Sequence, residues 1–257
     1  MRKPKVIIVM PAYNAVKTIK QTLDDIPEGS YDEIILVDDL SEDNTAEFAR
    51  ELGLKVIVHQ SNKGYGGNQK TCYHAALEAG ADIIVMLHPD YQYDPKLVPF
   101  LTGIISHGIC DIMMANRIRT RKEALKAGMP FYKYFFNRLL TITENIVLGL
   151  NLGEYHTGYR AFSRKALETV NFDLGSDDFV FDQHILVQAA SCGLRIGEIP
   201  VPAKYFKEAS SINFIRSFKY GLETLLVLFR YILHSWHIAP SGMFKPRKKE
   251  TGKEYGK

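Results

Sequence analysis

The first 115 residues alternate between short apolar runs and longer amphipathic segments. Each apolar run ends in a polar, acidic or glycine-rich turn, which is typical of buried strands, and the segments between them carry apolar residues at helical spacing. The pattern predicts strands at 5–10, 33–37, 55–58, 82–87 and 111–115, helices at 16–26 and 96–107, and further helices ending at 52 and 79. This order predicts an α/β protein with a doubly wound, mainly parallel sheet.

The alternation breaks after residue 116. Residues 130–150 form a helical pattern that is aromatic and apolar around most of its circumference, and 213–234 form a helix with an apolar stripe opposite basic residues. Between them, strands are predicted at 159–162 and 195–201, and a helix at 179–190. We therefore expect a domain over 1–210 with halves at 1–115 and 116–210, an amphipathic helix over 211–240, and a basic, flexible tail over 241–257.

Composition narrows the class of protein. The 257 residues are 46% hydrophobic and 24% charged, which is ordinary for a soluble protein with a core. No stretch reaches the roughly 20 apolar residues of a membrane span, and the first apolar run is too short for a signal peptide. Cys72, Cys110 and Cys192 have no metal-binding spacing, so we expect reduced thiols in a cytoplasmic protein.

The net charge of +3 is unevenly distributed along the chain. Residues 1–115 carry 10 Lys and Arg against 16 Asp and Glu, whereas residues 116–257 carry 22 against 13. An acidic first half suits a metal–nucleotide site, and a basic second half suits a surface that meets a phosphate or a lipid headgroup. Part of the basic excess lies in expected loops and tails, at 117–126 and 245–257, where it serves solubility.

Acidic residues directly follow two of the predicted strands. Asp38 and Asp39 come after the strand at 33–37, and His88 and Asp90 come after the strand at 82–87. Because the carboxyl ends of parallel strands meet at one edge of a sheet, both motifs should border one pocket. Such carboxylates suit a charged, metal-bridged ligand such as a nucleoside diphosphate. Each motif taken alone is also compatible with a plain turn.

Four motifs in this order resemble those of a known family. They are Pro11-Ala12-Tyr13-Asn14, Asp38-Asp39-x-Ser41-x-Asp43-x-Thr45, Asn62-x-Gly64-x-Gly66, and the acidic motif at 88–90 followed by Gln92 and Asp94-Pro95. Over residues 5–235 the chain resembles the family 2 glycosyltransferases of GT-A fold, and its spacing is most similar to the dolichyl-phosphate mannose and glucose synthase branch. The resemblance implies an inverting hexosyltransferase that uses a UDP- or GDP-sugar, often with a polyprenyl phosphate as acceptor. It makes 1–115 the donor half and 116–210 the acceptor half.

The resemblance also assigns a nucleotide-sugar site. Its residues are Pro11, Ala12, Tyr13, Asn14, Asp38, Asp39, Lys63, Gly64, Gly66 and Asp90. Asp39 matches the acid that binds the base, and Tyr13 matches the residue that packs on it. The glycines are expected to let the backbone approach the donor, and the helix after them to offer N–H groups to anionic oxygen. For Tyr13 and Asn14 the alternative is a turn.

The chain departs from the family at the acidic motif. The family usually has Asp-x-Asp, whose carboxylates hold Mg²⁺ or Mn²⁺ against the donor diphosphate, whereas this chain has His88-Pro89-Asp90. We expect a divalent metal, Mn²⁺ or Mg²⁺, with Asp90 and His88 as ligands. A neutral imidazole binds Mn²⁺ better than Mg²⁺. Alternatively, His88 is protonated and bonds the diphosphate itself, or it only ends the strand.

The acceptor side is predicted from a second group of residues. Asp182, on a segment that looks like the family's acid-bearing helix, is the candidate base for a hydroxyl acceptor and joins Asp90 as a candidate catalytic residue. A phosphate acceptor is already ionised and needs no base, so Asp182 would then orient Arg160 or hold the sugar. The phosphate-binding candidates are Arg117, Arg160, Lys204 and Lys207. The family usually has arginine in the segment that holds Lys204 and Lys207, and a lysine cannot bind a phosphate in the bidentate way that an arginine can.

The leading interpretation is therefore a cytoplasmic, peripheral membrane glycosyltransferase whose partners are a nucleotide sugar, a lipid-linked or glycan acceptor and an anionic membrane surface. The alternatives are transfer to a hydroxyl with Asp182 as base, a non-catalytic sugar-nucleotide binder, and a nucleotidyltransferase. The helices at 130–150 and 213–234 are expected to lie on the membrane surface, or else to pack internally or form a homo-oligomer. We expect no nucleic-acid partner.

Overall fold

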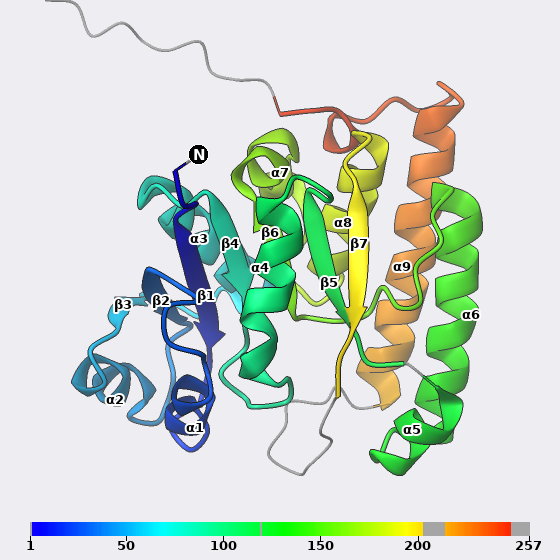
Figure 1. Cartoon of the computed structure of the whole chain (residues 1–257). Coiled ribbons are helices and arrows are strands. Elements are labelled where there is room, and N and C mark those ends of the chain that lie inside the picture. The colour runs from blue at the N-terminus through cyan, green and yellow to red at the C-terminus, as the bar shows by residue number, and fades with distance from the viewer. Residues whose placement is uncertain (1, 119, 203–213, 248–257) are drawn as a thin grey trace, which may run out of the picture.

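A computed structural model describes residues 2–118, 120–202 and 214–247 (Figure 1). Its centre is a seven-stranded sheet with the strand order β3-β2-β1-β4-β6-β5-β7. The strands are β1 Val6–Ala12, β2 Glu33–Asp38, β3 Lys55–Val58, β4 Ile83–Met86, β5 Ile112–Asn116, β6 Arg160–Ser163 and β7 Ile196–Pro200. All neighbours pair in parallel except β6, which runs antiparallel to both β4 and β5. The predicted α/β class with a mainly parallel sheet is confirmed.

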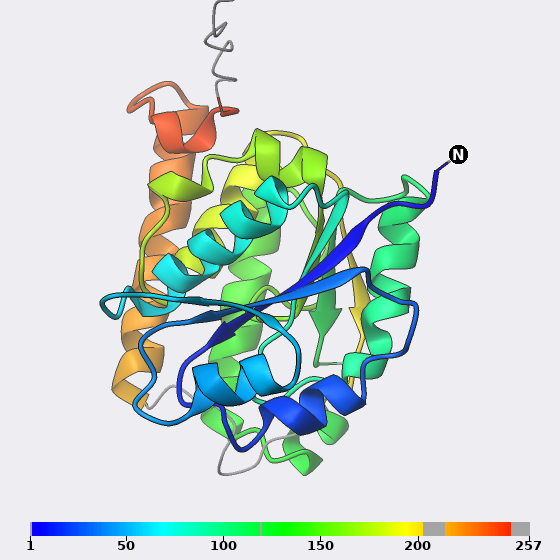
Figure 2. The ribbon, with the colours of Figure 1, turned by 90° about the vertical axis from the view of Figure 1, so that its left-hand side faces the viewer.

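Helices cover both faces of the sheet (Figure 2). They are α1 Ile19–Asp24, α2 Thr45–Glu51, α3 Gly64–Glu78, α4 Val98–Ser106, α5 Arg121–Lys126, α6 Phe131–Leu148, α7 Arg164–Thr169, α8 Phe181–Ser191 and α9 Phe214–Ser235. Side chains alternate along β1: Val6, Ile8 and Met10 join the core with α1, α2 and α4, while Ile7 and Val9 join the core with α3, α7 and α8. The sheet is therefore buried on both faces, as its continuous apolar strands require.

The sheet brings the predicted strand-end residues to one edge. Pro11 and Ala12 close β1 and are in register with the end of β2 at Asp38. On the other side of β1, β4 ends at Met86 and points the same way. Because β6 is antiparallel, it starts at this edge, and its first residue, Arg160, pairs with Met86. The segments after β1, β2, β4 and β5 and before β6 therefore lie along one edge of the sheet.

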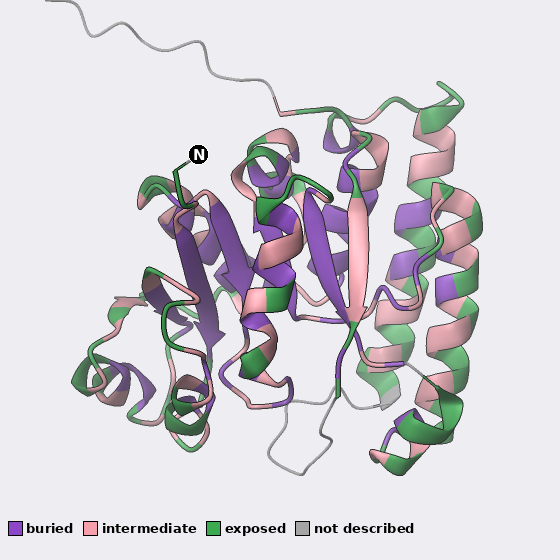
Figure 3. Ribbon diagram, viewed as in Figure 1, coloured by how far each residue is buried: buried purple, intermediate pink, exposed green. Residues whose placement is uncertain are grey.

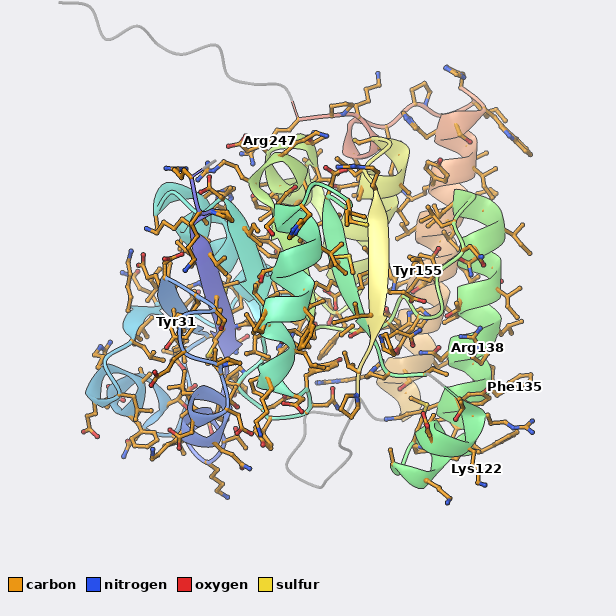
Figure 4. The ribbon with its side chains drawn as sticks, in the orientation of Figure 1. Tyr31, Lys122, Phe135, Arg138, Tyr155 and Arg247 are labelled. Atoms are coloured by element: carbon orange, nitrogen blue, oxygen red, sulfur yellow. The ribbon has the colours of Figure 1, made fainter. Side chains whose placement is uncertain are left out.

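Helices α6 and α9 lie side by side at one end of the sheet, and α9 also packs on α8 (Figure 1). Both helices carry many exposed residues, drawn green in Figure 3, and several of these residues have large apolar side chains. These residues are Phe131, Phe135, Phe136, Leu139, Ile142 and Ile146 on α6, and Ile215, Phe218, Leu222, Leu225, Leu226 and Phe229 on α9. Phe135, for example, points outward from α6 (Figure 4). Within the described ranges, no helix has the length and apolar character that crossing a membrane would require.

Two segments differ from expectation. Residues 117–126 were expected to be a loop but contain α5. Thr120 is the N-cap of this helix, and its hydroxyl accepts a hydrogen bond from the backbone N–H of Glu123. A flexible tail was expected from residue 241, but 241–247 is docked. Met243 and Phe244 are buried against residues of α8 and α9, and Arg247 pairs with Asp173 at 3.2 Å. Residues 248–257 lie outside the described part.

Candidate active site

Asp39 ties the end of β2 to the start of α3. Its carboxylate is 4% exposed and accepts hydrogen bonds from the backbone N–H groups of Lys63 at 2.8 Å and Gly64 at 2.9 Å. His59 Nδ1 lies 2.6 Å from Asp39 Oδ1. Three of the roughly four acceptor positions of the carboxylate are thus taken. The remaining position, on Oδ2, is available to a ligand N–H.

The turn after β1 lies beside this carboxylate. Asn14 has a left-handed backbone, with φ of 53°, and its Oδ1 accepts a hydrogen bond from the N–H of Glu42 at 2.8 Å. Asp38 accepts hydrogen bonds from the N–H of Ser41, at 2.9 Å, and from its hydroxyl. Asn14 and Asp38 thus hold local turns. Tyr13 is 51% exposed, so its ring can cover a planar ligand at the rim.

The glycine-rich loop meets the chain segment that precedes α8. Gly66 donates its N–H to the carbonyl of Asp177 at 2.8 Å, and the N–H of Gly67 lies 3.4 Å from the same oxygen. A Cβ on Gly64 would lie 2.7 Å from this carbonyl oxygen, and one on Gly66 would overlap the carbonyl of Ser176. The expectation that these N–H groups face the donor is therefore wrong for Gly66 and Gly67. The glycines let two backbone segments pack closely.

The side chains of Tyr65, His88 and Asp182 lie in contact at the end of β4. Tyr65 donates its hydroxyl hydrogen to Asp182 Oδ2 at 2.8 Å, and the hydroxyl oxygen of Tyr65 lies 3.3 Å from His88 Nε2. The rings of Tyr65 and His88 stack with centroids 5.5 Å apart. Gly158 makes room for this pair, since a Cβ there would lie 2.7 Å from His88 Nε2. Burial lowers the pKa of His88 against the opposing charges of Asp90 and Asp182, which favours a neutral imidazole.

Asp90 and His88 together fit only part of a metal coordination shell. Asp90 Oδ1 accepts a hydrogen bond from the N–H of Gln92 at 3.0 Å. In the part of the chain that the structure describes, no three His, Cys, Asp or Glu side chains converge as a dedicated metal site. Mg²⁺ at phosphate sites commonly takes one or two protein ligands and fills its shell with phosphate oxygens and water. The donor set therefore fits a cation that arrives with a diphosphate.

Arg160 lies beneath the site and holds Asp182. Its side chain is wholly buried, and its guanidinium donates to the carbonyls of Tyr155, Thr157 and Asp182 at 2.7–3.0 Å. It also lies 3.4 Å from Asp182 Oδ1, which accepts a hydrogen bond from Gln69 Nε2 at 3.2 Å. Arg160 does not reach the cavity surface, so its assignment to the acceptor phosphate is not retained. Both oxygens of Asp182 are engaged, which leaves it poorly placed to act as a base.

Two cations lie on the cavity wall. Arg117 donates from Nε to Glu154 Oε1 at 3.0 Å, and its guanidinium lies 5.9 Å from the ring centroid of Tyr93. Lys133 of α6 lines the same cavity. Burial lowers the pKa of the Lys133 ammonium, and the charge of Arg117 lowers it further. The buried carboxylate of Glu154 pairs with Arg117, so Arg117 and Lys133 contribute one carboxylate-paired and one further cation to this wall.

Sequence reasoning missed Lys133 and Tyr65. The signal for Lys133 was available, because it is the one cation in the aromatic run 131–136. The contribution of Tyr65 depends on its contact with Asp182, which is distant in the sequence. Lys204 and Lys207 lie outside the described residues.

A cavity of about 370 Å³ connects the groups around His88 and Asp90 to the exposed helices, whereas Tyr13, Asp38 and Asp39 do not line it. Its polar wall comes from α3, α6, α8 and the segments after β4 and β5 and before β6, and its apolar wall comes from α6 and α9. The polar side chains are Tyr65, His88, Asp90, Arg117, Lys133, His156 and Asp182, and the apolar ones include Phe136, Leu139, Leu140, Phe218, Leu222 and Leu225. The cavity therefore suits a molecule with a charged end joined to a hydrocarbon.

The sequence profile described as "Glycosyl transferase family 2" matches residues 7–170, and the chain belongs to this family. It is therefore a glycosyltransferase, as the resemblance predicted. Solved structures of glucosyl-3-phosphoglycerate synthase from Mycobacterium tuberculosis confirm the GT-A fold: one, in complex with Mn²⁺, UDP and product, has a TM-score of 0.67 at 20% identity and covers 93% of this chain and 82% of its own.

Two related proteins are transferases named for lipid-phosphate acceptors. The UDP-N-acetylglucosamine–dolichyl-phosphate N-acetylglucosaminyltransferase of Methanococcus voltae is 30% identical over 241 residues, which cover 86% of this chain and 95% of that protein. The undecaprenyl-phosphate mannosyltransferase of Micrococcus luteus is 25% identical over 207 residues, with coverage of 77% and 82%. These similarities support the predicted branch of the family.

Proposed function

We propose that this glycosyltransferase moves a sugar, with inversion, from a UDP- or GDP-sugar to a polyprenyl phosphate at a membrane surface. The observation that carries the proposal is the cavity, in which strand-end polar groups and the apolar side chains of α6 and α9 line one space. An acceptor with an anionic end and a long hydrocarbon matches both walls. The relatives named for dolichyl-phosphate and undecaprenyl-phosphate transfer support the same acceptor class.

On the donor side, we assign the base to Tyr13 and the remaining acceptor position of Asp39, beside the turn formed by Pro11, Ala12 and Asn14. Asp90 would hold the divalent cation, Mn²⁺ or Mg²⁺, with His88 as a second ligand. The related synthase structure that contains Mn²⁺ and UDP supports this pairing of metal and nucleotide. A bound cation would neutralise charge that develops on the diphosphate leaving group.

On the acceptor side, we assign the phosphate to the space between Arg117 and Lys133. An ionised phosphate oxygen attacks the anomeric carbon of the sugar from the face opposite the diphosphate. The new C–O bond forms as the bond to the nucleotide diphosphate breaks, so the configuration inverts. The nucleophile is already an anion, so the chemistry requires positioning rather than a base. The engaged carboxylate of Asp182 agrees with a role in holding Arg160 and the cavity floor.

A transfer assay tests this proposal. The wild-type enzyme is incubated with Mn²⁺, a panel of UDP- and GDP-sugars, and either a polyprenyl phosphate, the matching polyprenol or inorganic phosphate. We expect sugar transfer to the polyprenyl phosphate alone. Lys133→Ala should raise the KM for this acceptor, whereas Lys122→Ala, an exposed lysine on α5 (Figure 4), should not. Transfer to the polyprenol would instead support the hydroxyl alternative, and no turnover with any donor would support a non-catalytic binder.

The membrane part of the proposal has its own test. The exposed apolar residues of α6 and α9 are flanked on α9 by Arg216, Lys219 and Arg230, and each cation near an anionic bilayer contributes about 1 kcal/mol. We expect the protein to float with anionic vesicles at low salt and less so at high salt. Phe229→Ser should weaken flotation, whereas Phe100→Ser, which changes an equally exposed aromatic residue on α4, should not. Salt-independent self-association without flotation would indicate a homo-oligomer instead.

A further inference from the structure

A buried carboxyl group on α6 has no evident structural purpose. Glu144 is 0% exposed, and neither of its carboxyl oxygens has a hydrogen-bond partner among the described residues. Leaving a buried polar group without a hydrogen bond costs about 1–3 kcal/mol. A leucine at this position would avoid that cost, so the retained carboxyl group calls for a role beyond packing.

His156 lies between the carboxyl group of Glu144 and the cavity. Glu144 Oε2 lies 3.3 Å from His156 Nε2. On the other side of the imidazole, His156 Nδ1 lies 2.9 Å from Gln183 Nε2 on α8 and 3.0 Å from the hydroxyl oxygen of Tyr220 on α9. The group therefore joins α6, α8, α9 and the segment before β6, and both His156 and Tyr220 line the cavity.

The available hydrogens indicate which atoms of Gln183, His156 and Tyr220 donate and which accept. The amide of Gln183 faces His156 Nδ1 at 2.9 Å and the oxygen of Tyr220 at 2.6 Å, with the carbonyl of Tyr155 more distant at 3.4 Å. If the amide donates to Nδ1, the imidazole carries its hydrogen on Nε2, which lies 3.3 Å from Glu144 Oε2 without forming a hydrogen bond to it. The oxygen of Tyr220 accepts from Gln183 at 2.6 Å and lies 3.0 Å from His156 Nδ1. Because Gln183 occupies the single lone pair of Nδ1 in this arrangement, the hydroxyl hydrogen of Tyr220 has no acceptor within the trio. Burial raises the pKa of the Tyr220 phenol, which therefore keeps that hydrogen.

We propose that Tyr220 donates a hydrogen bond to the acceptor phosphate, and that Glu144, His156 and Gln183 are positioning residues that orient its hydroxyl. This inference rests on the proposed function, because it takes the anion between Arg117 and Lys133 to be that phosphate. It adds a neutral donor from α9 to the two cations. Only when α9 is docked against α6 and α8 is the phosphate site complete, which links the membrane-facing helix to the chemistry.

Steady-state kinetics with a polyprenyl phosphate test the inference. Tyr220→Phe should lower kcat/KM for the acceptor by at least about tenfold, since a hydrogen bond to a charged group contributes that much or more. The affinity for the nucleotide sugar should stay within twofold. Tyr231→Phe removes a hydroxyl from the same helix, where the ring packs on Phe244, and serves as the matched control. If the two variants match within twofold, the inference is overturned.

The positioning chain is tested by a double-mutant cycle. Glu144→Leu should reproduce the loss seen in Tyr220→Phe, and the double variant should be no worse than Tyr220→Phe alone, because both changes act on one hydrogen bond. Glu144→Gln should restore activity, since its amide oxygen can accept from His156 Nε2. Additive losses would mean that Glu144 acts only on the fold and would overturn its positioning role. If the wild type fails to use a polyprenyl phosphate at all, the proposed function itself fails, which is a separate outcome.

Discussion

Replacing Gly66 with alanine tests the corrected role of the glycine-rich loop. The new Cβ would overlap the carbonyl of Ser176 and lie 2.7 Å from the Cβ of Phe181, so the backbone before α8 must move. Overpacking of this kind costs about 1–3 kcal/mol. The hydrogen bond from Gly66 to Asp177 adds about 0.5–1.5 kcal/mol if it breaks. Alanine recovers roughly 0.5–1 kcal/mol within a helix, which leaves a net loss of roughly 0.5–4 kcal/mol if the hydrogen bond breaks.

Thermal denaturation measures this loss directly. A protein of this size loses about 2–4 °C in Tm per kcal/mol, so Gly66→Ala should lower Tm by roughly 1–16 °C. Gly103 lies inside α4, where an added Cβ would meet no other atom within 4 Å, so Gly103→Ala should raise Tm slightly. If Gly66→Ala is as stable as Gly103→Ala but no longer binds the nucleotide, the glycine serves the donor, and the packing argument is refuted.

Three further predictions concern the site and its surroundings. Asp39→Ala and Asp90→Ala should each abolish or severely reduce transfer while circular dichroism stays unchanged, and near-normal turnover in the Asp90 variant would exclude its metal role. His88→Asp should retain activity and shift the metal preference toward Mg²⁺ in the transfer assay; an unchanged preference would mean that His88 is not a ligand. Burial raises the pKa of Glu144 well above its ordinary value, so folding penalises the ionised form. The contribution of Glu144 to the free energy of unfolding is fully present below about pH 4.5 and is lost as the pH rises through the raised pKa. In denaturant titrations over that pH range, Glu144→Gln should therefore become progressively more stable than the wild type. A pH-independent difference would contradict this reasoning.

The sheet and its acidic edge could be predicted because they depend on local pattern. Apolar runs that end in Asp38 and Asp90 identify strands and their ends, and parallel topology brings those ends together. The capping pair Thr120 and Glu123 also marks a local structure, with a signal that spans only four residues. Features of this kind can be predicted from the sequence alone.

The parts that could not be predicted depend on contacts between distant segments. Arg160 looked like an anion ligand, but its burial is decided by carbonyls that surround it only after β6 and α8 have packed. The glycines of the loop looked like a ligand cradle, although their neighbour is a backbone carbonyl more than a hundred residues away, at Asp177. Nothing in the sequence around Glu144 indicates that this carboxyl group is fully buried, because its burial depends on segments that are distant in the chain.

The position of β6 between β4 and β5 has a consequence for how the chain folds during synthesis. Strands β1 to β4 occupy one contiguous half of the sheet, so this half can assemble once about the first 90 residues have left the ribosome. β5 follows soon afterwards, but its two partners, β6 and β7, are made only from Arg160 onward. Until then the open side of β4 and both sides of β5 are unpaired apolar edges, which are prone to aggregate. The nascent chain should therefore depend most on chaperones while residues 117–159 are being synthesised.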